Sequence, residues 1–224
     1  MTTTNTSTKL TTPATASVDA ATTDTLQALS EIISARRSIR KFTDLPVSKE
    51  VLELLLDAAR LAPSAKNRQP WKFIVLQGQA KADMLKAFKN GLARERDLGD
   101  FLPNYGHYIG GAEHSVTILE QAPAVILVVN TNSRPVTTTV DVEERIAQNC
   151  DIQAIGAAIQ NMLLTGTAMG LGTLWVCDYY FAYPELMEWI NEPGDLLAMV
   201  AVGWPGEEPG AWPRRDLKDI TEWR

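Results

Sequence analysis

Helical patterns and short apolar segments alternate along most of this chain, and their order limits the folds that it can adopt. Two helical patterns come first, and the later apolar segments have the length and composition of buried strands. The expected helices span about residues 24–36, 48–62, 81–92, 141–169 and 183–191. The expected strands span residues 71–77, 124–130, 173–177 and 196–203. This order predicts a mixed α/β or α+β domain with about four core strands.

The folded domain is expected to begin at Asp24, a candidate N-cap with Gln27 three residues later. Residues 1–23 are mostly Thr, Ser, Ala and Asn and include no aromatic side chain. Such a segment buries too little apolar surface to offset the entropy lost on ordering, so we predict a disordered tail. A transit peptide is the alternative, although the absence of arginine weighs against it. The domain itself is expected to span residues 24–224.

The overall charge and the two cysteines restrict the class of protein. A formal net charge of −6 over 224 residues argues against general binding to nucleic acids or anionic membranes, which depends on excess Lys and Arg. The longest apolar runs, such as residues 122–129, are too short to span a bilayer. Cys150 and Cys177 could form at most one disulfide, and no signal peptide is visible. We therefore expect free thiols in a cytoplasmic protein.

A cluster of basic residues follows the first helix, in the sequence Ala-Arg-Arg-Ser-Ile-Arg-Lys-Phe at residues 35–42. One interpretation is an exposed helix C-terminus, where Arg and Lys interact favourably with the helix dipole. In the other, the segment is extended, so that Arg36, Ser38 and Arg40 project to the same side. Two guanidinium groups and a hydroxyl on one side would suit a phosphate, which accepts paired hydrogen bonds from charged donors. The pattern alone leaves both interpretations open.

Two further segments could contribute to a ligand site. Residues 63–71, Pro-Ser-Ala-Lys-Asn-Arg-Gln-Pro-Trp, are either an ordinary polar turn or a loop that binds a hydroxyl-rich ligand such as a ribityl chain. Residues 169–178, Met-Gly-Leu-Gly-Thr-Leu-Trp-Val-Cys-Asp, join the longest helix to a strand. Two glycines at such a junction usually end a helix. They do not form a dinucleotide-binding fingerprint, which lies between a strand and the helix that follows it.

The least regular stretch spans residues 91–115, where glycine and proline interrupt aromatic side chains. Such an insert is typical of a lid or a binding loop. Its two histidines, His107 and His114, suggest substrate contact or plain surface more than a metal site, because no cysteine lies between them. Cys177 has no histidine near it in sequence, so we expect it to serve packing and not as a nucleophile. The sequence therefore assigns no metal ligand.

Taken together, these segments resemble the nitroreductase family of flavoproteins. The resemblance rests on Arg-Arg-Ser-Ile-Arg-Lys-Phe, Pro-Ser-x-x-Asn-x-Gln-Pro-Trp, Gly-Leu-Gly-Thr-Leu-Trp and the terminal Pro-Arg-Arg-Asp-Leu, and it covers about residues 27–224. It implies an α+β fold with a central, mainly antiparallel sheet flanked by helices. It also implies an intertwined homodimer that binds FMN in each of two sites at the interface.

The resemblance implies a role for individual residues in cofactor binding. Arg36 and Ser38 match contacts to the phosphate and ribityl groups, with Arg37 adding a backbone contact or charge, and Arg40 matches a cation near the pyrimidine edge of the flavin. The residues that would reach the flavin bound mainly by the other subunit are Pro63, Ser64, Ala65 and Asn67. The segment whose backbone would lie against the flavin is Trp175, Val176 and Cys177. The C-terminal residues that would close over the phosphate are Arg214 and Arg215.

The activity implied by the resemblance is hydride transfer from NADH or NADPH through FMN to a nitroaromatic, a quinone or a similar small-molecule acceptor, in a ping-pong cycle. Because the flavin carries the chemistry, no catalytic side chain is assigned. Two alternatives use the same fold for reductive dehalogenation or for oxygen-dependent fragmentation of the flavin. A third is a flavin-binding protein without catalytic activity.

Overall fold

The computed structural model of the protein describes residues 20–224, so residues 1–19 of the predicted tail lie outside the described residues, whereas residues 20–23 are helical. The chain divides into two compact units, one ending at Ser34 and the other spanning residues 35–224. Helix α1 (Ala20–Ala35) supplies the described part of the first unit. It begins four residues before Asp24, so the predicted N-cap at Asp24 is wrong. Alanine has the highest helix propensity, and residues 20 and 21 are both alanine, which explains the earlier start.

The second unit is built on one four-stranded sheet, whose strands are β1 (Trp71–Leu76), β2 (Ala124–Asn130), β3 (Gly172–Val176) and β4 (Asp195–Gly203). The strands lie in the order β1-β2-β4-β3, and every neighbouring pair is antiparallel. All four strands lie within one residue of their predicted bounds. The antiparallel α+β fold expected from the resemblance is therefore confirmed.

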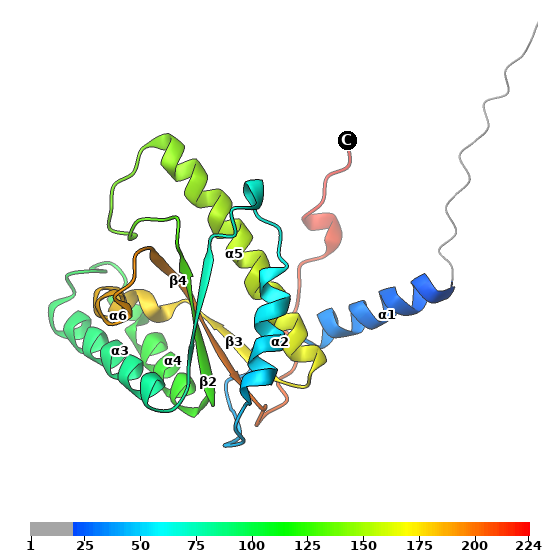
Figure 1. The fold of residues 1–224 in the computed structure, drawn as a ribbon, viewed down its shortest axis with the longest axis horizontal. Coiled ribbons are helices and arrows are strands. Elements are labelled where there is room, and N and C mark those ends of the chain that lie inside the picture. Colours follow the sequence, from blue (N-terminus) through cyan, green and yellow to red (C-terminus); the bar gives the residue numbers. More distant parts are fainter. Residues whose placement is uncertain (1–19) are drawn as a thin grey trace, which may run out of the picture. The chain divides into compact units, whose positions relative to one another are not determined.

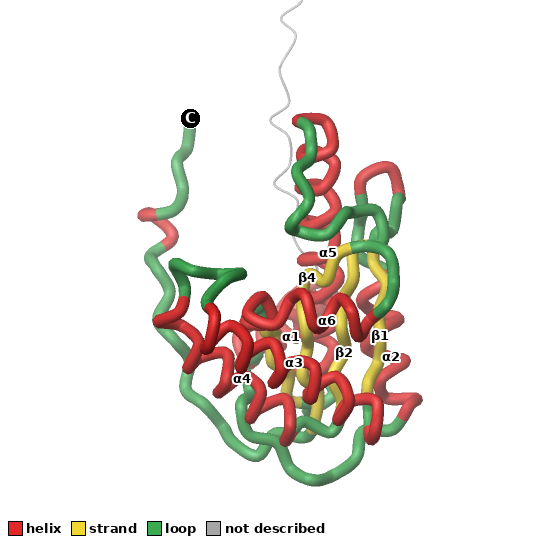
Figure 2. Tube along the Cα trace, turned by 90° about the vertical axis from the view of Figure 1, so that its left-hand side faces the viewer, coloured by secondary structure: helices red, strands yellow, loops and turns green. Residues whose placement is uncertain are grey.

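Helices cover both faces of this sheet. One face is covered by α3 (Gly78–Leu98), α4 (Ile109–Gln121) and α6 (Tyr183–Ile190), and the other by α2 (Lys49–Arg60) and α5 (Val142–Ala168). Figure 1 shows these two groups on opposite sides of the strands. In Figure 2, α3, α4 and α6 lie in front of the sheet. β2 is buried throughout, and its successive side chains alternate between the two apolar clusters.

Helix α3 corrects one prediction about the irregular insert. The helix was expected to end at Leu92, but α3 continues to Leu98. A Cβ at Gly91 would lie 2.3 Å from the Cβ of Ala182, so this glycine allows a close approach of two segments and does not break the helix. With α4 beginning at Ile109, only residues 99–108 separate the two helices. The expected lid of residues 91–115 is therefore a short connection between two long helices.

The other helix predictions are confirmed with one exception. The Ser48 side chain caps α2 by accepting a hydrogen bond from the Val51 N–H, and Asp141 caps α5 in the same way with Glu144 N–H (2.8 Å). Along α5, Ile155 and Ile159 are buried, but Ile152 is 49% exposed. The residue before it, Asp151, faces the interior instead.

Candidate functional site

The basic segment after α1 lies in an extended conformation along the outer edge of β3. The Ile39 N–H donates to the Thr173 carbonyl oxygen at 3.0 Å, and Ser38 forms a parallel bridge with Thr173. Ile39 and Phe42 are buried in the core beneath. Of the two interpretations of this cluster, the extended segment is the one observed. The buried apolar residues hold it against the sheet and leave its polar residues available.

Residues far apart in the sequence meet beside this segment. A cavity of about 190 Å³ is lined by Arg36, Arg37, Ser38 and Arg40 on one side and by residues 209–212 and Arg214 on the other. Four guanidinium groups and no carboxylate line this cavity. Such a set of donors suits an anion with several oxygens, above all a phosphate. Arg215 does not line the cavity; its guanidinium donates to the Asp219 carbonyl oxygen at 2.8 Å.

The hydrogen bonds around the cavity leave much of its donor capacity available. Among the described residues, the Arg36 guanidinium has no hydrogen bond or ion pair, and Arg214 donates only to the neighbouring carbonyls of Trp212 (3.1 Å) and Pro213 (3.3 Å). The Arg40 guanidinium donates to the Ser38 carbonyl at 3.3 Å, while its backbone N–H donates to Glu207 Oε1 at 2.6 Å. Glu207 therefore anchors the segment at Arg40 through the backbone without neutralising the cavity.

The polar loop between α2 and β1 has an unusual backbone. Lys66, Asn67 and Gln69 all have positive φ, at 54°, 54° and 47°. For residues other than glycine, such conformations cost about 1–3 kcal/mol each and persist only where surrounding contacts impose them. Within the loop, Ser64 Oγ accepts from the Gln69 N–H at 3.0 Å, and the Ser64 carbonyl accepts from the Asn67 N–H at 3.0 Å. The loop therefore has a defined conformation stabilised by internal hydrogen bonds and is not an ordinary polar turn.

A long-range ion pair joins this loop to α5. The Arg68 guanidinium donates to Asp151 Oδ1 at 2.5 Å and to the Ala147 carbonyl oxygen at 3.1 Å. The Asp151 side chain is only 3% exposed, whereas that of Arg68 is 33% exposed. Neither residue was predicted to matter at the site. The sequence feature that could have indicated this pair was Asp151, a charged residue among the apolar positions of the helical pattern.

A second cavity, of about 260 Å³, separates this loop from α5. Pro63, Ser64 and Ala65 line one wall, as expected for a ligand site, and Asn67 does not line it. The opposite wall consists of α5 residues that include Cys150 and Gln153, which the sequence analysis did not identify. The lining is mostly apolar, with the Ser64 hydroxyl and the Gln153 amide as polar groups. It suits a flat apolar group with a polar rim.

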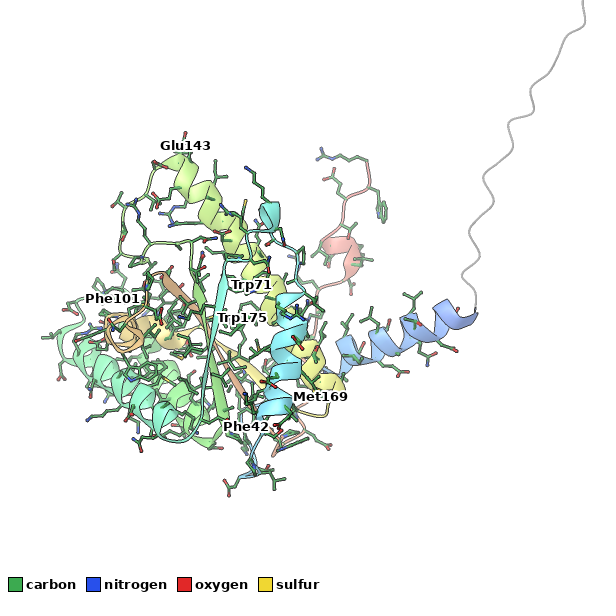
Figure 3. All side chains as sticks on the ribbon, viewed as in Figure 1. Phe42, Trp71, Phe101, Glu143, Met169 and Trp175 are labelled. Atoms are coloured by element: carbon green, nitrogen blue, oxygen red, sulfur yellow. The ribbon has the colours of Figure 1, made fainter. Side chains whose placement is uncertain are left out.

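β3 offers backbone groups at the edge of the sheet. β3 is an edge strand, and Thr173 uses its outward-facing carbonyl to bind Ile39. Backbone groups of alternate residues face the same edge, so those of Trp175 also point outward, beyond the end of the covering segment. The Val176 side chain is buried in the core, so only its backbone could meet a ligand. The Trp175 side chain lies on the α5 side of the sheet, where it is 38% exposed (Figure 3).

Cys177 directly follows β3 and is a free thiol, and Cys150 is also free. Burial, and secondly the Asp178 carboxylate, raise the pKa of the Cys177 thiol above its usual value. Asp178 in turn accepts a hydrogen bond from the Ser115 hydroxyl at 2.5 Å, which ties α4 to the end of β3. A protonated thiol is a poor nucleophile, as expected for Cys177. The residue is exposed, however, so the packing role expected for it is not supported.

Residues 20–224 offer neither a metal site nor a membrane-spanning helix. No group of three or more His, Cys, Asp or Glu side chains within this range could hold a metal ion. None of its helices is long and apolar enough to cross a membrane.

Comparison with known proteins assigns the chain to a family. The model of the nitroreductase family matches residues 33–204. This chain belongs to the nitroreductase family. A relative from Methanothermobacter thermautotrophicus, described as a candidate NADH dehydrogenase/NAD(P)H nitroreductase, is 31% identical over 199 residues, which cover 84% of this chain and 82% of the relative.

Solved structures share the nitroreductase fold. A candidate nitroreductase from Desulfovibrio desulfuricans, solved in complex with FMN, is 29% identical with a TM-score of 0.63, over 88% of this chain and 96% of that one. The FMN-dependent nitroreductase NfnB from Mycobacterium smegmatis, in complex with NADPH, has a TM-score of 0.69 at 20% identity, over 90% of this chain and 100% of that one. The second likeness is one of fold alone.

Proposed function

We propose that the protein is an FMN-dependent oxidoreductase that takes a hydride from NADH or NADPH and passes it to a small-molecule acceptor such as a nitroaromatic or a quinone. The observation that carries this proposal is the cavity in which Arg36, Ser38 and Arg40 meet Arg214. Membership of the nitroreductase family, a relative named as an NAD(P)H nitroreductase and a similar structure bound to FMN support it.

The residues of the arginine-lined cavity fit the phosphate end of FMN. A phosphate monoester carries close to two negative charges near neutral pH, and this protein has a net charge of −6. Binding therefore needs local cations, which Arg36 and Arg214 supply from opposite ends of the sequence. The Ser38 hydroxyl adds a neutral donor beside them. Because Arg40 lines the same cavity, its proposed role near the pyrimidine edge requires its long side chain to extend away from the phosphate.

The other two segments fit the remainder of the cofactor. The outward-facing backbone of Trp175 can hydrogen-bond the polar edge of a flat heterocycle. The loop of residues 63–70 presents the Ser64 hydroxyl and apolar groups to the second cavity, and Gln153 of α5 adds an amide there, as contact with a flavin requires. When bound, FMN would supply the two-electron chemistry, accepting and then donating a hydride. The protein's part is to bind and orient the cofactor and to stabilise negative charge near it through Arg40.

We also propose that the protein acts as a homodimer. Its C-terminal segment exposes large apolar side chains that a monomer would leave in water: Trp212 at 79%, Leu217 at 71% and Trp223 at 91%. α5 likewise exposes Val142 at 71% and Ile146 at 59%. Exposed apolar groups in such number favour a protein interface. Light scattering after gel filtration should give twice the chain mass of 24.6 kDa, and a monomeric mass at micromolar concentration would contradict this proposal.

The central experiment is a flavin titration followed by an acceptor screen. The purified protein should bind FMN, and its flavin absorbance should bleach when NADH or NADPH is added without oxygen. Addition of a nitroaromatic or a quinone should restore the absorbance, and initial rates with both substrates varied should give the parallel lines of a ping-pong cycle. A protein that takes up no FMN would overturn the proposal.

The same experiment separates the alternative activities. Bleaching without reoxidation by any acceptor would indicate a flavin-binding protein without this activity. Halide release from a halogenated phenol, or fragmentation of reduced FMN in oxygen, would indicate one of the other two reactions.

A further inference from the structure

We propose that Asp151 is a positioning residue for the cofactor, because through Arg68 it holds the loop of residues 63–70 in the conformation that presents Ser64 and Asn67. This inference rests on the proposed function and extends it to a residue on α5. Asp151 would not touch the cofactor; it would act through Arg68.

The first step concerns the backbone on either side of Arg68. Arg68 itself has an ordinary helical conformation, with φ of −70° and ψ of −21°. Its two neighbours, Asn67 and Gln69, have φ of 54° and 47°. Left-handed conformations at two residues other than glycine, one on each side of a right-handed residue, cost free energy that other contacts must offset. A contact that fixes Arg68 therefore lies between the two residues with positive φ, where it can stabilise the conformation of the whole loop.

The second step concerns what the ion pair contributes. The carboxylate of Asp151 is 3% exposed, and burying a carboxylate has a large desolvation cost that a single partner offsets only in part. An apolar residue on this helix would avoid that cost. The ion pair does fix the orientation of the Arg68 side chain. One of its terminal nitrogens donates to both Asp151 Oδ1 (2.5 Å) and the Ala147 carbonyl oxygen (3.1 Å), which lie one helical turn apart. Arg68 is thereby attached to one place on α5.

The third step concerns location. The cavity between the loop and α5 is lined by Ser64 and Ala65 and, across from them, by Cys150 and Ala154. These two α5 residues flank Asp151 in sequence, so the ion pair is formed beside this cavity. The other end of the loop is fixed independently, since the Pro70 carbonyl accepts from the Thr131 N–H at 2.8 Å. Loss of the ion pair should release the loop between Ser64 and Gln69 and leave β1 in place.

The test uses the full chain with Asp151→Asn, Arg68→Lys and a control. Asp151→Asn removes the charge but keeps an oxygen that can accept from Arg68, so no unpaired ion is buried. Arg68→Lys keeps the charge but lacks the planar fork of donors. The control breaks the exposed ion pair of α2 with Arg60→Gln; Arg60 and Asp57 are 2.7 Å apart and about 61–62% exposed. All four proteins are compared well below their melting temperatures.

Two measurements distinguish positioning from a general loss of stability. In protein without FMN, hydrogen exchange at the amides of Asn67, Arg68 and Gln69 should accelerate at least severalfold in Asp151→Asn, with β1 unchanged. In the same variant, FMN should bind about tenfold more weakly, because ligand contacts held less rigidly lose affinity. The absorption spectrum of the bound flavin should also change, and Arg68→Lys should be intermediate in all three. Arg60→Gln should match the unmodified protein.

The outcomes are separable. Unchanged exchange of the three loop amides, or unchanged FMN affinity and spectrum in Asp151→Asn, would overturn the positioning role while leaving the proposed function intact. Failure of the unmodified protein to bind FMN would overturn the proposed function, and the positioning role with it. Accelerated exchange throughout the domain, β1 included, would show a purely structural role for the ion pair and would also overturn the inference.

Discussion

The side chain of Ile39 occupies the space that a side chain at Gly172 would need. A Cβ at Gly172 would lie 2.9 Å from Ile39 Cγ2, 3.0 Å from its Cβ and 3.1 Å from its Cγ1. Three contacts with one β-branched side chain cannot be relieved by a change of rotamer. The absence of a side chain at Gly172 therefore lets the basic segment lie directly on β3.

We expect Gly172→Ala to disturb the arginine-lined cavity from beneath. To accommodate the methyl group, the segment of residues 36–42 must move away from β3, which shifts Ser38 and Arg40 on either side of Ile39. Overpacking of this kind costs about 1–3 kcal/mol of folding stability, and FMN affinity should fall as well. Chemical denaturation and FMN titration measure the two effects. Gly106→Ala is a suitable control, because a Cβ there would meet nothing within 4 Å. Equal behaviour of the two variants would contradict this account.

The C-terminal arginines allow the placement of the phosphate to be tested. Arg36→Ala and Arg214→Ala should each weaken FMN binding by about 1.5–3 kcal/mol, the range for hydrogen bonds to charged groups. Arg215→Ala should have a smaller effect, because Arg215 binds the Asp219 carbonyl outside the cavity. Isothermal titration at two salt concentrations should also show that the unmodified protein loses affinity as salt rises. Arg224→Ala removes an 85% exposed arginine and controls for net charge. A loss for Arg215→Ala as large as that for Arg214→Ala would place the phosphate elsewhere.

The sequence predicted well what depends on local pattern. The fully apolar run of β2, the helix starts near Ser48 and Asp141 and the glycine that ends α5 each carry their signal within a few residues. Gly170 has the positive φ of 75° that makes glycine favourable after a helix. The conformation of the basic segment was harder to predict, because the sequence from Arg36 to Arg40 is compatible with an exposed helix end and with an extended segment at a sheet edge. The resemblance to the nitroreductase family, and not the spacing, favoured the second.

What the sequence could not predict depends on contacts between distant residues. Glycine at position 91 lowers helix propensity, and the reason for its presence in α3 is the close approach of Ala182, which lies 91 positions later. Arg68 and Asp151 are 83 positions apart, and only the fold shows that they pair. The same pair accounts for the exposure of Ile152, because the ion pair draws Asp151 inward and turns the adjacent isoleucine toward solvent. Hydrophobicity alone favoured the opposite arrangement.

Asp195 should make folding stability depend on pH. Burial raises the pKa of this carboxyl above its usual value, and the hydrogen bond from the Tyr183 hydroxyl (2.5 Å) only partly offsets this effect. The folded state therefore binds the proton more tightly than the unfolded state does. Stability must then fall as pH rises from about 4, the unfolded pKa, to the raised folded pKa, and level off above it.

Replacement of Asp195 by Asn should remove this dependence. The amide oxygen can still accept from Tyr183, but it does not ionise, so the variant should gain stability relative to the unmodified protein as pH rises above about 4. Urea denaturation between pH 4 and 8 measures the difference. Glu222→Asn, at an exposed C-terminal carboxylate, is the control. A stability difference that shrinks with rising pH would show that the Asp195 pKa is lowered.

Cys177 provides a test of the electrostatics at the end of β3. Burial and the neighbouring Asp178 carboxylate raise the pKa of this thiol, so alkylation by iodoacetamide should follow a pH profile whose midpoint is higher in the folded protein than in urea. Asp178→Asn removes the negative charge and should shift the folded midpoint down, while its amide oxygen can still accept from Ser115. Peptide mass spectrometry follows Cys177 separately from Cys150, and Asp216→Asn at an exposed carboxylate serves as the control. The midpoint of the pH profile reports ionisation of the thiol, whereas the plateau rate reports its accessibility to the reagent. Identical midpoints for Asp178→Asn and the unmodified protein would therefore show that burial alone raises the pKa of Cys177.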